Sequence, residues 1–195
     1  FIFQTDKFVI AQYIGVNQVT PYTIGYKIFS TMSMIVTLTL SPLWPAYGEA
    51  KALGEIKWIK QTHSNIALFS FTIFFIFSIF IILFGRGILK YFFPQDSIPS
   101  AILLFLIAVY FLIKTFTDIY AVLINGLDMI APQAISAIAQ AVVTMFSMIM
   151  LVKVVGLIGI PLGGIIGYIS SSAWFLPYLI HKYFKNQEYS IRNFH

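Results

Sequence analysis

The sequence predicts an all-α, polytopic transmembrane helix bundle with about six spans. Hydrophobic residues make up 59% of the 195 residues, whereas charged residues make up only 10%. Soluble domains carry about 25% charged residues, so this sequence is too apolar for a water-facing surface. Five long runs contain no Asp, Glu, Lys or Arg: 28–48, 61–85, 97–113, 129–152 and 154–181. An α-helix needs about 20 apolar residues to cross a bilayer, whereas barrel strands would alternate in polarity.

Proline, glycine and polar residues separate the predicted helices. We place the helices at 1–14, 20–46, 63–85, 99–125, 130–152 and 157–183, and the connections at 15–18, 48–61, 85–100, 125–132 and 153–156. Pro99 and Pro132 fall where a first helical turn tolerates proline, and Gly126 and Gly156 fall where helices tend to stop. The chain begins at Phe1 in an apolar segment without a basic n-region or a cleavage site. We therefore expect part of a longer protein and not a signal peptide.

The placement of lysine and arginine predicts a cytoplasmic C-terminus. The 48–61 connection and the C-terminal tail would share one side of the membrane, with Lys51, Lys57, Lys60, Lys182, Lys185 and Arg192. The other side would hold Arg86, Lys90 and Lys153. Basic residues concentrate in cytoplasmic loops, so six against three favours this orientation.

Polar residues within three predicted spans recur at helical spacing. The stripes are Thr20, Thr23, Lys27, Ser30, Met34, Thr37 and Ser41; Tyr110, Lys114, Thr117, Asp118 and Asn125; and Gln133, Ser136, Gln140, Thr144 and Ser147. Spacings of three and four place each stripe on one helix face, and we expect the three faces to meet. Helix packing through small and hydroxyl residues is the competing explanation. The phenylalanine-rich span 63–85 is instead predicted to face lipid.

Ionisable residues inside the spans favour a functional cavity. A Lys or Asp at a helix centre costs about 2.5–3.5 kcal/mol on lenient insertion scales, and such residues usually face a bundle interior or a water-filled cavity. Lys114 lies near the middle of its predicted helix, and Asp118 follows one turn later, where the two side chains can pair. The predicted cavity-lining, substrate-binding residues are Lys27, Lys114, Asp118, Asp6, Lys7 and Gln140.

The last predicted span contains glycine at four-residue spacing, at Gly159, Gly163 and Gly167, beside Pro161. This pattern is typical of close helix packing. Flexing during transport is an alternative that the sequence alone does not favour.

The sequence contains no motif for catalysis or cofactor binding. It has no Walker loop, HExxH motif, dinucleotide fingerprint or serine elbow. His63, His181 and His195 are too scattered to suggest a metal site, and cysteine is absent. We therefore expect neither an enzyme nor a cofactor, and no nucleic-acid partner.

Residues 5–50 carry a more specific pattern. It comprises Asp6, Lys7, Gly15, the VTPY of 19–22, and Pro42, Trp44, Pro45, Ala46, Tyr47, Glu49 and Ala50. The following GEIKWIKQT and the later Asn125-Gly126 also fit. The chain resembles the second half of the Wzx-type O-antigen and capsular polysaccharide flippases, which belong to the MOP (multidrug/oligosaccharidyl-lipid/polysaccharide) exporter superfamily.

The resemblance implies one lobe of a two-lobe transporter, with this chain as the C-terminal lobe and the N-terminal lobe absent from it. It also implies a flippase that moves an undecaprenyl-diphosphate-linked oligosaccharide across the bacterial inner membrane by alternating access. Lys27 and Lys114 would attract the diphosphate, the polar stripes would bind sugars, and Asp118 would hold Lys114. The expected partners are this substrate, membrane lipid, and polysaccharide polymerase or assembly proteins. The predicted spans contain no arginine, unlike many cavities of this superfamily.

Two alternatives stay open. A drug or small-cation exporter of the same superfamily would favour acidic over basic cavity residues, whereas lysines at least match aspartates here. A membrane assembly subunit that transports nothing would use its polar faces only for helix packing.

Overall fold

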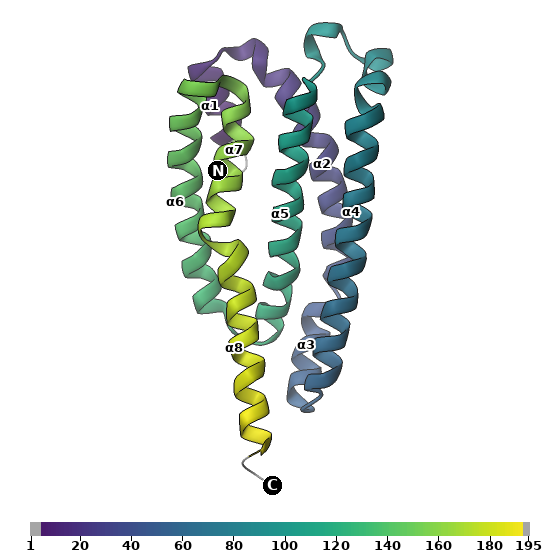
Figure 1. Cartoon of the computed structure of the whole chain (residues 1–195), viewed down its shortest axis with the longest axis vertical. Coiled ribbons are helices and arrows are strands. Elements are labelled where there is room, and N and C mark those ends of the chain that lie inside the picture. The colour runs from purple at the N-terminus through teal and green to yellow at the C-terminus, as the bar shows by residue number, and fades with distance from the viewer. Residues whose placement is uncertain (1–4, 193–195) are drawn as a thin grey trace.

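The computed structural model describes residues 5–192, and every regular element in that range is helical (Figure 1). The α-helices are α1 (Thr5–Tyr13), α2 (Val19–Leu40), α3 (Leu43–Ala52), α4 (Ile56–Phe92), α5 (Ala101–Gly126), α6 (Ile130–Val155), α7 (Gly159–Ser170) and α8 (Ser172–Arg192). Single 3-10 turns lie at η2 (Val16–Gln18), η3 (Gln95–Ser97) and η4 (Gly156–Ile158). Residues 1–4 of the first predicted span and His195 lie outside the described range.

Four stretches of the described chain are long and apolar enough to cross a membrane, and the last runs from α6 to α8. The chain reverses at η4, so α6 and α7 lie side by side and this stretch makes two passes (Figure 1). The prediction of an all-α, polytopic membrane bundle is confirmed.

Two helices, α2 and α3, replace the single helix predicted over 20–46. α2 ends at Leu40, and α3 begins at Leu43 with Pro42 as its N-cap residue. Proline has no N–H to continue the backbone hydrogen-bond ladder, so the helix is interrupted here. α3 then continues to Ala52, and only residues 53–55 connect it to α4. Most of the connection predicted over 48–61 is therefore helical.

α4 presents its phenylalanines on two sides. Six of them are exposed: Phe69, Phe71, Phe75, Phe80, Phe84 and Phe92. Phe74 is buried instead, and its ring centroid lies 6.5 Å from that of Phe29 on α2. The exposed set gives α4 an apolar outer face, as expected of a helix that contacts lipid.

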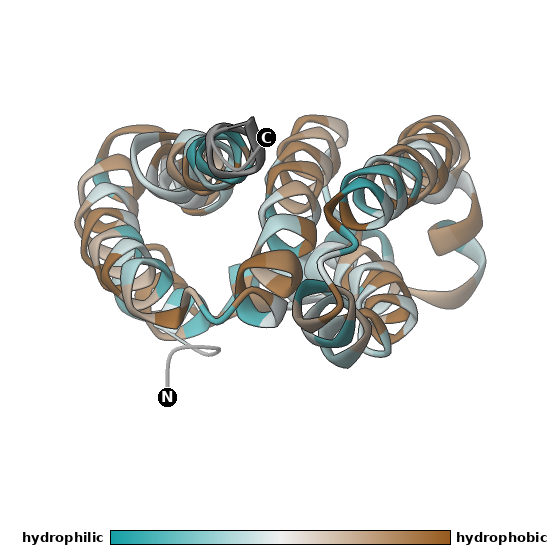
Figure 2. Ribbon diagram, turned by 90° about the horizontal axis from the view of Figure 1, so that it is seen from below, coloured by the Kyte–Doolittle hydropathy of each residue, from teal (hydrophilic) through white to brown (hydrophobic). Residues whose placement is uncertain are grey.

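α5 is the central helix of the structure. It packs against α2, α3, α4, α7 and α8, and it lies between the α6–α8 group and the α2–α4 group when the molecule is seen end-on (Figure 2). Phe111 illustrates this position, since it is buried and stacks against Phe29 with ring centroids 6.5 Å apart. Side chains on different faces of α5 therefore meet different helices.

Glycines bring the backbones of α6 and α7 together. A Cβ built on Gly163 would lie 2.5 Å from the backbone nitrogen of Met148, and one on Gly159 would lie 2.6 Å from the carbonyl carbon of Leu151. A Cβ on Gly167 would overlap Thr144. Only a residue without a Cβ permits this approach, so the close-packing interpretation of the glycine pattern is confirmed.

The two ends of the bundle separate the basic residues as the sequence predicts. The α3–α4 connection and the C-terminal end of α8 lie at one end, and the α4–α5 connection and η4 lie at the other (Figure 1). Lys57, Lys182 and Lys185 thus share an end, opposite Lys90 and Lys153.

Replacement of Gly163 by alanine is expected to destabilise the protein by about 1–3 kcal/mol, because the backbone at Met148 must move to admit the new methyl group. Thermal unfolding of the full-length protein in detergent measures the effect. The control is Gly87→Ala on α4, where a Cβ meets no atom within 4 Å. Equal loss of stability in both variants would contradict the packing argument.

The orientation can be tested by cysteine labelling. Lys57→Cys should react with a membrane-impermeant thiol reagent only when the cytoplasmic face is exposed, and Lys90→Cys should react in intact spheroplasts. Both positions are exposed at opposite ends of the bundle. The unsubstituted protein gives the background signal, since this chain contains no cysteine. Labelling of both positions from one side would refute the arrangement.

Candidate functional site

Lys114 and Asp118 form an ion pair in the middle of α5. The Lys114 Nζ donates a hydrogen bond of 2.5 Å to the Asp118 Oδ2, and the two side chains are 23% and 29% exposed. Residues four apart lie on one helix face, which permits this contact. Pairing offsets part of the cost of placing either charge in hydrocarbon. The predicted contact is therefore present, and both groups stay accessible from one side.

Tyrosine rings border the ion pair. Tyr110 lies one turn before Lys114 and packs edge-on against Tyr168 of α7, with ring centroids 5.7 Å apart. Both rings are close enough to Asp118 for electrostatic interaction. Tyr110 also lies directly against Gly164, where a Cβ would be 2.5 Å from the ring. A glycine on α7 thus provides the space for an aromatic side chain beside the charges.

Asp6 on α1 extends this group of polar side chains toward α2. It is only 8% exposed, and the Tyr22 hydroxyl lies within hydrogen-bonding reach of its carboxylate. The backbone N–H of Lys7 donates a hydrogen bond of 2.9 Å to the Asp6 Oδ1. Asp6 also interacts electrostatically with Tyr110. Tyr110 therefore interacts with both predicted acidic site residues, Asp6 and Asp118.

Gln140 holds α6 to the junction between α7 and α8. The Ser172 Oγ donates a hydrogen bond of 2.5 Å to the Gln140 Oε1, and the hydroxyls of Ser136 and Ser172 lie 3.0 Å apart. The Tyr168 side chain is also hydrogen-bonded to Gln140. Helix packing thus accounts for this part of the α6 stripe. Gln140 still reaches the ion pair indirectly, because Tyr168 adjoins Asp118.

The polar stripe of α2 does not face the other two, contrary to the expectation that all three meet. α2 buries Tyr22, Gly25 and Phe29 against the bundle, and Lys27 is exposed on a different side. The Lys27 carbonyl accepts hydrogen bonds from Ser30 and Thr31. α2 turns this face inward because its small and aromatic residues pack more closely against α5 than the hydroxyl groups of its polar stripe would.

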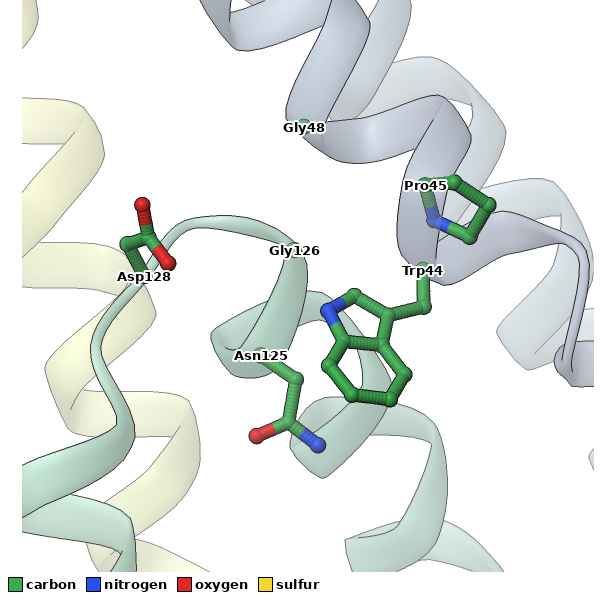
Figure 3. Close-up of a pocket in the computed structure, with 6 residues that line it drawn as sticks. All are labelled: Trp44, Pro45, Gly48, Asn125, Gly126 and Asp128. Atoms are coloured by element: carbon green, nitrogen blue, oxygen red, sulfur yellow. The ribbon is translucent and has the colours of Figure 1, made fainter.

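A pocket of about 350 Å³ opens where α3 meets the end of α5 (Figure 3). Its lining residues are Trp44, Pro45, Gly48, Asn125, Gly126 and Asp128. The sequence motifs include Trp44 and Asn125, but the pattern does not reveal that these distant segments meet. Tyr22 and Tyr168 are likewise absent from the predicted site. The sequence feature that could have identified them is a polar hydroxyl inside an otherwise apolar span. Within residues 5–187, no group of three His, Cys, Asp or Glu side chains is placed to hold a metal ion.

Single replacements at the ion pair are expected to destabilise the protein more than the double replacement. Lys114→Met or Asp118→Leu leaves one charge without its partner, at a cost on the order of 1–3 kcal/mol for a pair that is partly exposed. Lys114→Met with Asp118→Leu removes both charges and should recover most of that loss. The unfolding temperatures of the wild type, the two single variants and the double variant in detergent give a double-mutant cycle. Additive losses would contradict the pairing.

Comparison with known proteins identifies relatives over nearly the whole chain. A "Putative O-antigen transporter" of Salmonella typhimurium is 31% identical over 183 residues, which cover 92% of this chain and 42% of the relative. A protein of the same name from Salmonella typhi is 28% identical over 193 residues, covering 93% of this chain and 42% of the relative. A "Putative O-antigen export protein" of Yersinia pseudotuberculosis is 25% identical over 178 residues, covering 91% and 41%.

No family model matches the chain, and no solved structure matches it. The chain spans about two fifths of the length of the curated relatives it matches. The family resemblance predicted from residues 5–50 is confirmed: this helical membrane chain is related, over nearly all of its length, to part of the proteins named as O-antigen transporters.

Proposed function

We propose that this chain forms the C-terminal lobe of a flippase for lipid-linked oligosaccharides, with Lys114 as a ligand of the substrate's diphosphate. The observation that carries the proposal is the Lys114–Asp118 ion pair, because its two charges lie at the centre of the central helix and yet remain partly exposed. Ionisable groups at that depth usually mark a substrate path. The names of the three relatives supply the class of cargo.

The ion pair suits the reversible binding of an anionic head group. The Lys114 ammonium has three donors, of which Asp118 uses one, so phosphate oxygens compete with the carboxylate for the same cation. The interaction is strong because the surroundings of the pair are apolar and aromatic. Asp118 neutralises Lys114 when no substrate is bound. When the diphosphate takes Lys114, the Asp118 carboxylate loses its counter-ion and would bind a proton or another cation in its place, which gives it a role in coupling transport to that cation.

The other predicted site residues have distinct places in this proposal. Lys27 and the hydroxyls beside it form an exposed polar face on α2, which would line the space between two lobes. Asp6 and Lys7 would border that space from α1. Gln140 would support Tyr168 next to the ion pair more than it would contact sugar, since Ser172 already occupies its amide oxygen.

The whole transporter would work by alternating access, with two lobes rocking about a site near the middle of the bacterial inner membrane. The cargo would cross unchanged, so the proposal needs no catalytic group. Polysaccharide polymerase or assembly proteins would receive it on the far side. The relatives are long enough to contain a second lobe, since this chain matches only about two fifths of each.

Replacement of Lys114 by glutamine is expected to reduce surface polysaccharide at least tenfold in a strain that depends on this protein, because glutamine cannot bind the diphosphate as a cation. Lipopolysaccharide or capsule gels and immunoblots of protein level provide the measurement. Lys90→Gln on α4, an exposed lysine at one end of the bundle, is the matched control. Normal polysaccharide at normal Lys114→Gln protein level would refute the site.

Replacement of both Lys114 and Asp118 by leucine distinguishes the remaining functions. A transporter that binds its cargo here loses transport although the protein remains stable. An assembly subunit that transports nothing tolerates the change, because it loses only a pair that is internally neutral. A drug exporter of the same superfamily would lose drug resistance and keep normal surface polysaccharide.

A further inference from the structure

We propose that the pocket between α3 and the end of α5 is a carbohydrate-binding site that holds one pyranose ring of the cargo's glycan. The assignment of a glycan rests on the proposed function, whereas the site itself rests on its own geometry. The pocket of about 350 Å³ lies at the end of the bundle that carries Lys51, Lys57 and Lys60, the predicted cytoplasmic end. The cargo would meet it before crossing the membrane.

The lining of the pocket matches the surface of a sugar. A pyranose ring has apolar C–H faces and a rim of hydroxyls that both donate and accept hydrogen bonds. The indole of Trp44 is 53% exposed and offers a flat apolar surface. Asn125 has both a donor and an acceptor, and the Asp128 carboxylate is an acceptor. Figure 3 shows the indole and the Asn125 amide beside each other at the end of α5, with Asp128 on the turn that follows.

The polar groups of the pocket are free to bind a ligand. Neither the Asn125 amide nor the Asp128 carboxylate forms a hydrogen bond within the described part of the chain. Asp128 has a φ of 62°, a left-handed conformation that glycine adopts without strain. A carboxylate at this position is therefore retained at some cost to the backbone. Backbone hydrogen bonds form the turn, so the Asp128 carboxylate stays available to a ligand.

Hydrogen bonds hold the backbone segments that form the pocket. The N–H of Met129 donates to the Ile124 carbonyl at 3.0 Å, and the N–H of Asp128 donates to the Asn125 carbonyl at 3.1 Å, which together close the end of α5 in a Schellman turn. Lys51 of α3 donates a hydrogen bond of 2.7 Å to the Leu127 carbonyl in the same turn. These contacts hold the backbone of α3 against the turn that carries Asn125 and Asp128, so little backbone ordering is required on binding.

The pocket also lies on the same face of α5 as the ion pair. Lys114, Asp118 and Asn125 are spaced by four and then seven residues, which aligns them along the helix. Eleven residues separate Lys114 from Asn125, or about 16 Å at the helical rise of 1.5 Å per residue. A glycan attached to a diphosphate at Lys114 would reach the pocket by extending along this face of α5.

Saturation-transfer NMR on the full-length protein in phospholipid nanodiscs tests the site directly. The probe is the oligosaccharide released by mild acid from the host's own lipid-linked intermediate, and inorganic pyrophosphate is the second probe. We expect saturation transfer to C–H protons of one sugar ring, unchanged when pyrophosphate is added. Trp44→Leu and Asp128→Gly should each weaken the signal at least fivefold. Asp128→Gly suits the left-handed turn, so it removes the carboxylate without a folding defect.

Trp174→Leu provides the matched control, since Trp174 is an equally exposed tryptophan on α8, at 59%, outside the pocket. Equal signals from wild type, Trp44→Leu and Asp128→Gly, or no transfer to the wild type, would overturn the carbohydrate site. Lys114→Gln should retain binding of the free oligosaccharide, because that probe carries no diphosphate. If the pocket binds no oligosaccharide but Lys114→Gln is defective in transport, the proposed function stands and only the carbohydrate site is refuted. Binding at the pocket with normal transport in Lys114→Gln refutes the role of Lys114 alone.

Discussion

Close approach of helix backbones is the constraint on which this lobe depends. In a bilayer the surrounding lipid is as apolar as the side chains, so helices gain little from burying leucine and must instead pack tightly or form hydrogen bonds. The structure meets this constraint at Gly159 and Gly163 between α6 and α7, and at Gly126 between α5 and α3. A Cβ on Gly126 would lie only 2.6 Å from the Cβ of Tyr47. The central position of α5 follows from contacts of this kind.

The polar groups occupy the space that close packing leaves. Tyr110 fits against Gly164, and this places its ring beside Asp118. Gln140 of α6 and Ser172 of α8 are hydrogen-bonded to each other, and Gln140 also interacts with Tyr168, which packs against Tyr110 beside the pair. The charges of α5 are therefore surrounded by groups that are themselves fixed by packing. A site with such support keeps its geometry whether or not a ligand is present.

Sequence periodicity predicts well where the helices lie in the chain, but it predicts poorly which helix faces pack against each other. Apolar runs locate α5 and α6 to within three residues at every end, whereas α4 extends seven residues beyond the predicted span of 63–85 at each end. A four-residue spacing is sufficient to predict the contact of Lys114 with Asp118. The same periodicity cannot say which face of α2 turns inward, because Tyr22, Gly25 and Phe29 recur at the same spacing as its polar stripe. Glycine and aromatic residues determine that choice through shape. The pocket at Trp44 cannot be predicted from periodicity either, because it forms only where two segments distant in sequence, α3 and the end of α5, meet.

The break at Pro42 has a consequence for how the lobe can bend. Proline at positions 42 and 45 leaves the carbonyls of Leu38 and Ser41 without their usual helical donors. α3 is meanwhile fastened to the far end of α5 through Lys51 and Gly126. The α2–α3 junction thus lacks two hydrogen bonds of a continuous helix, whereas α2 itself packs against α5 along its buried face. A change of angle at this junction would move Lys27 with α2, while the close contact between α3 and α5 would keep the backbone of Trp44 beside Gly126.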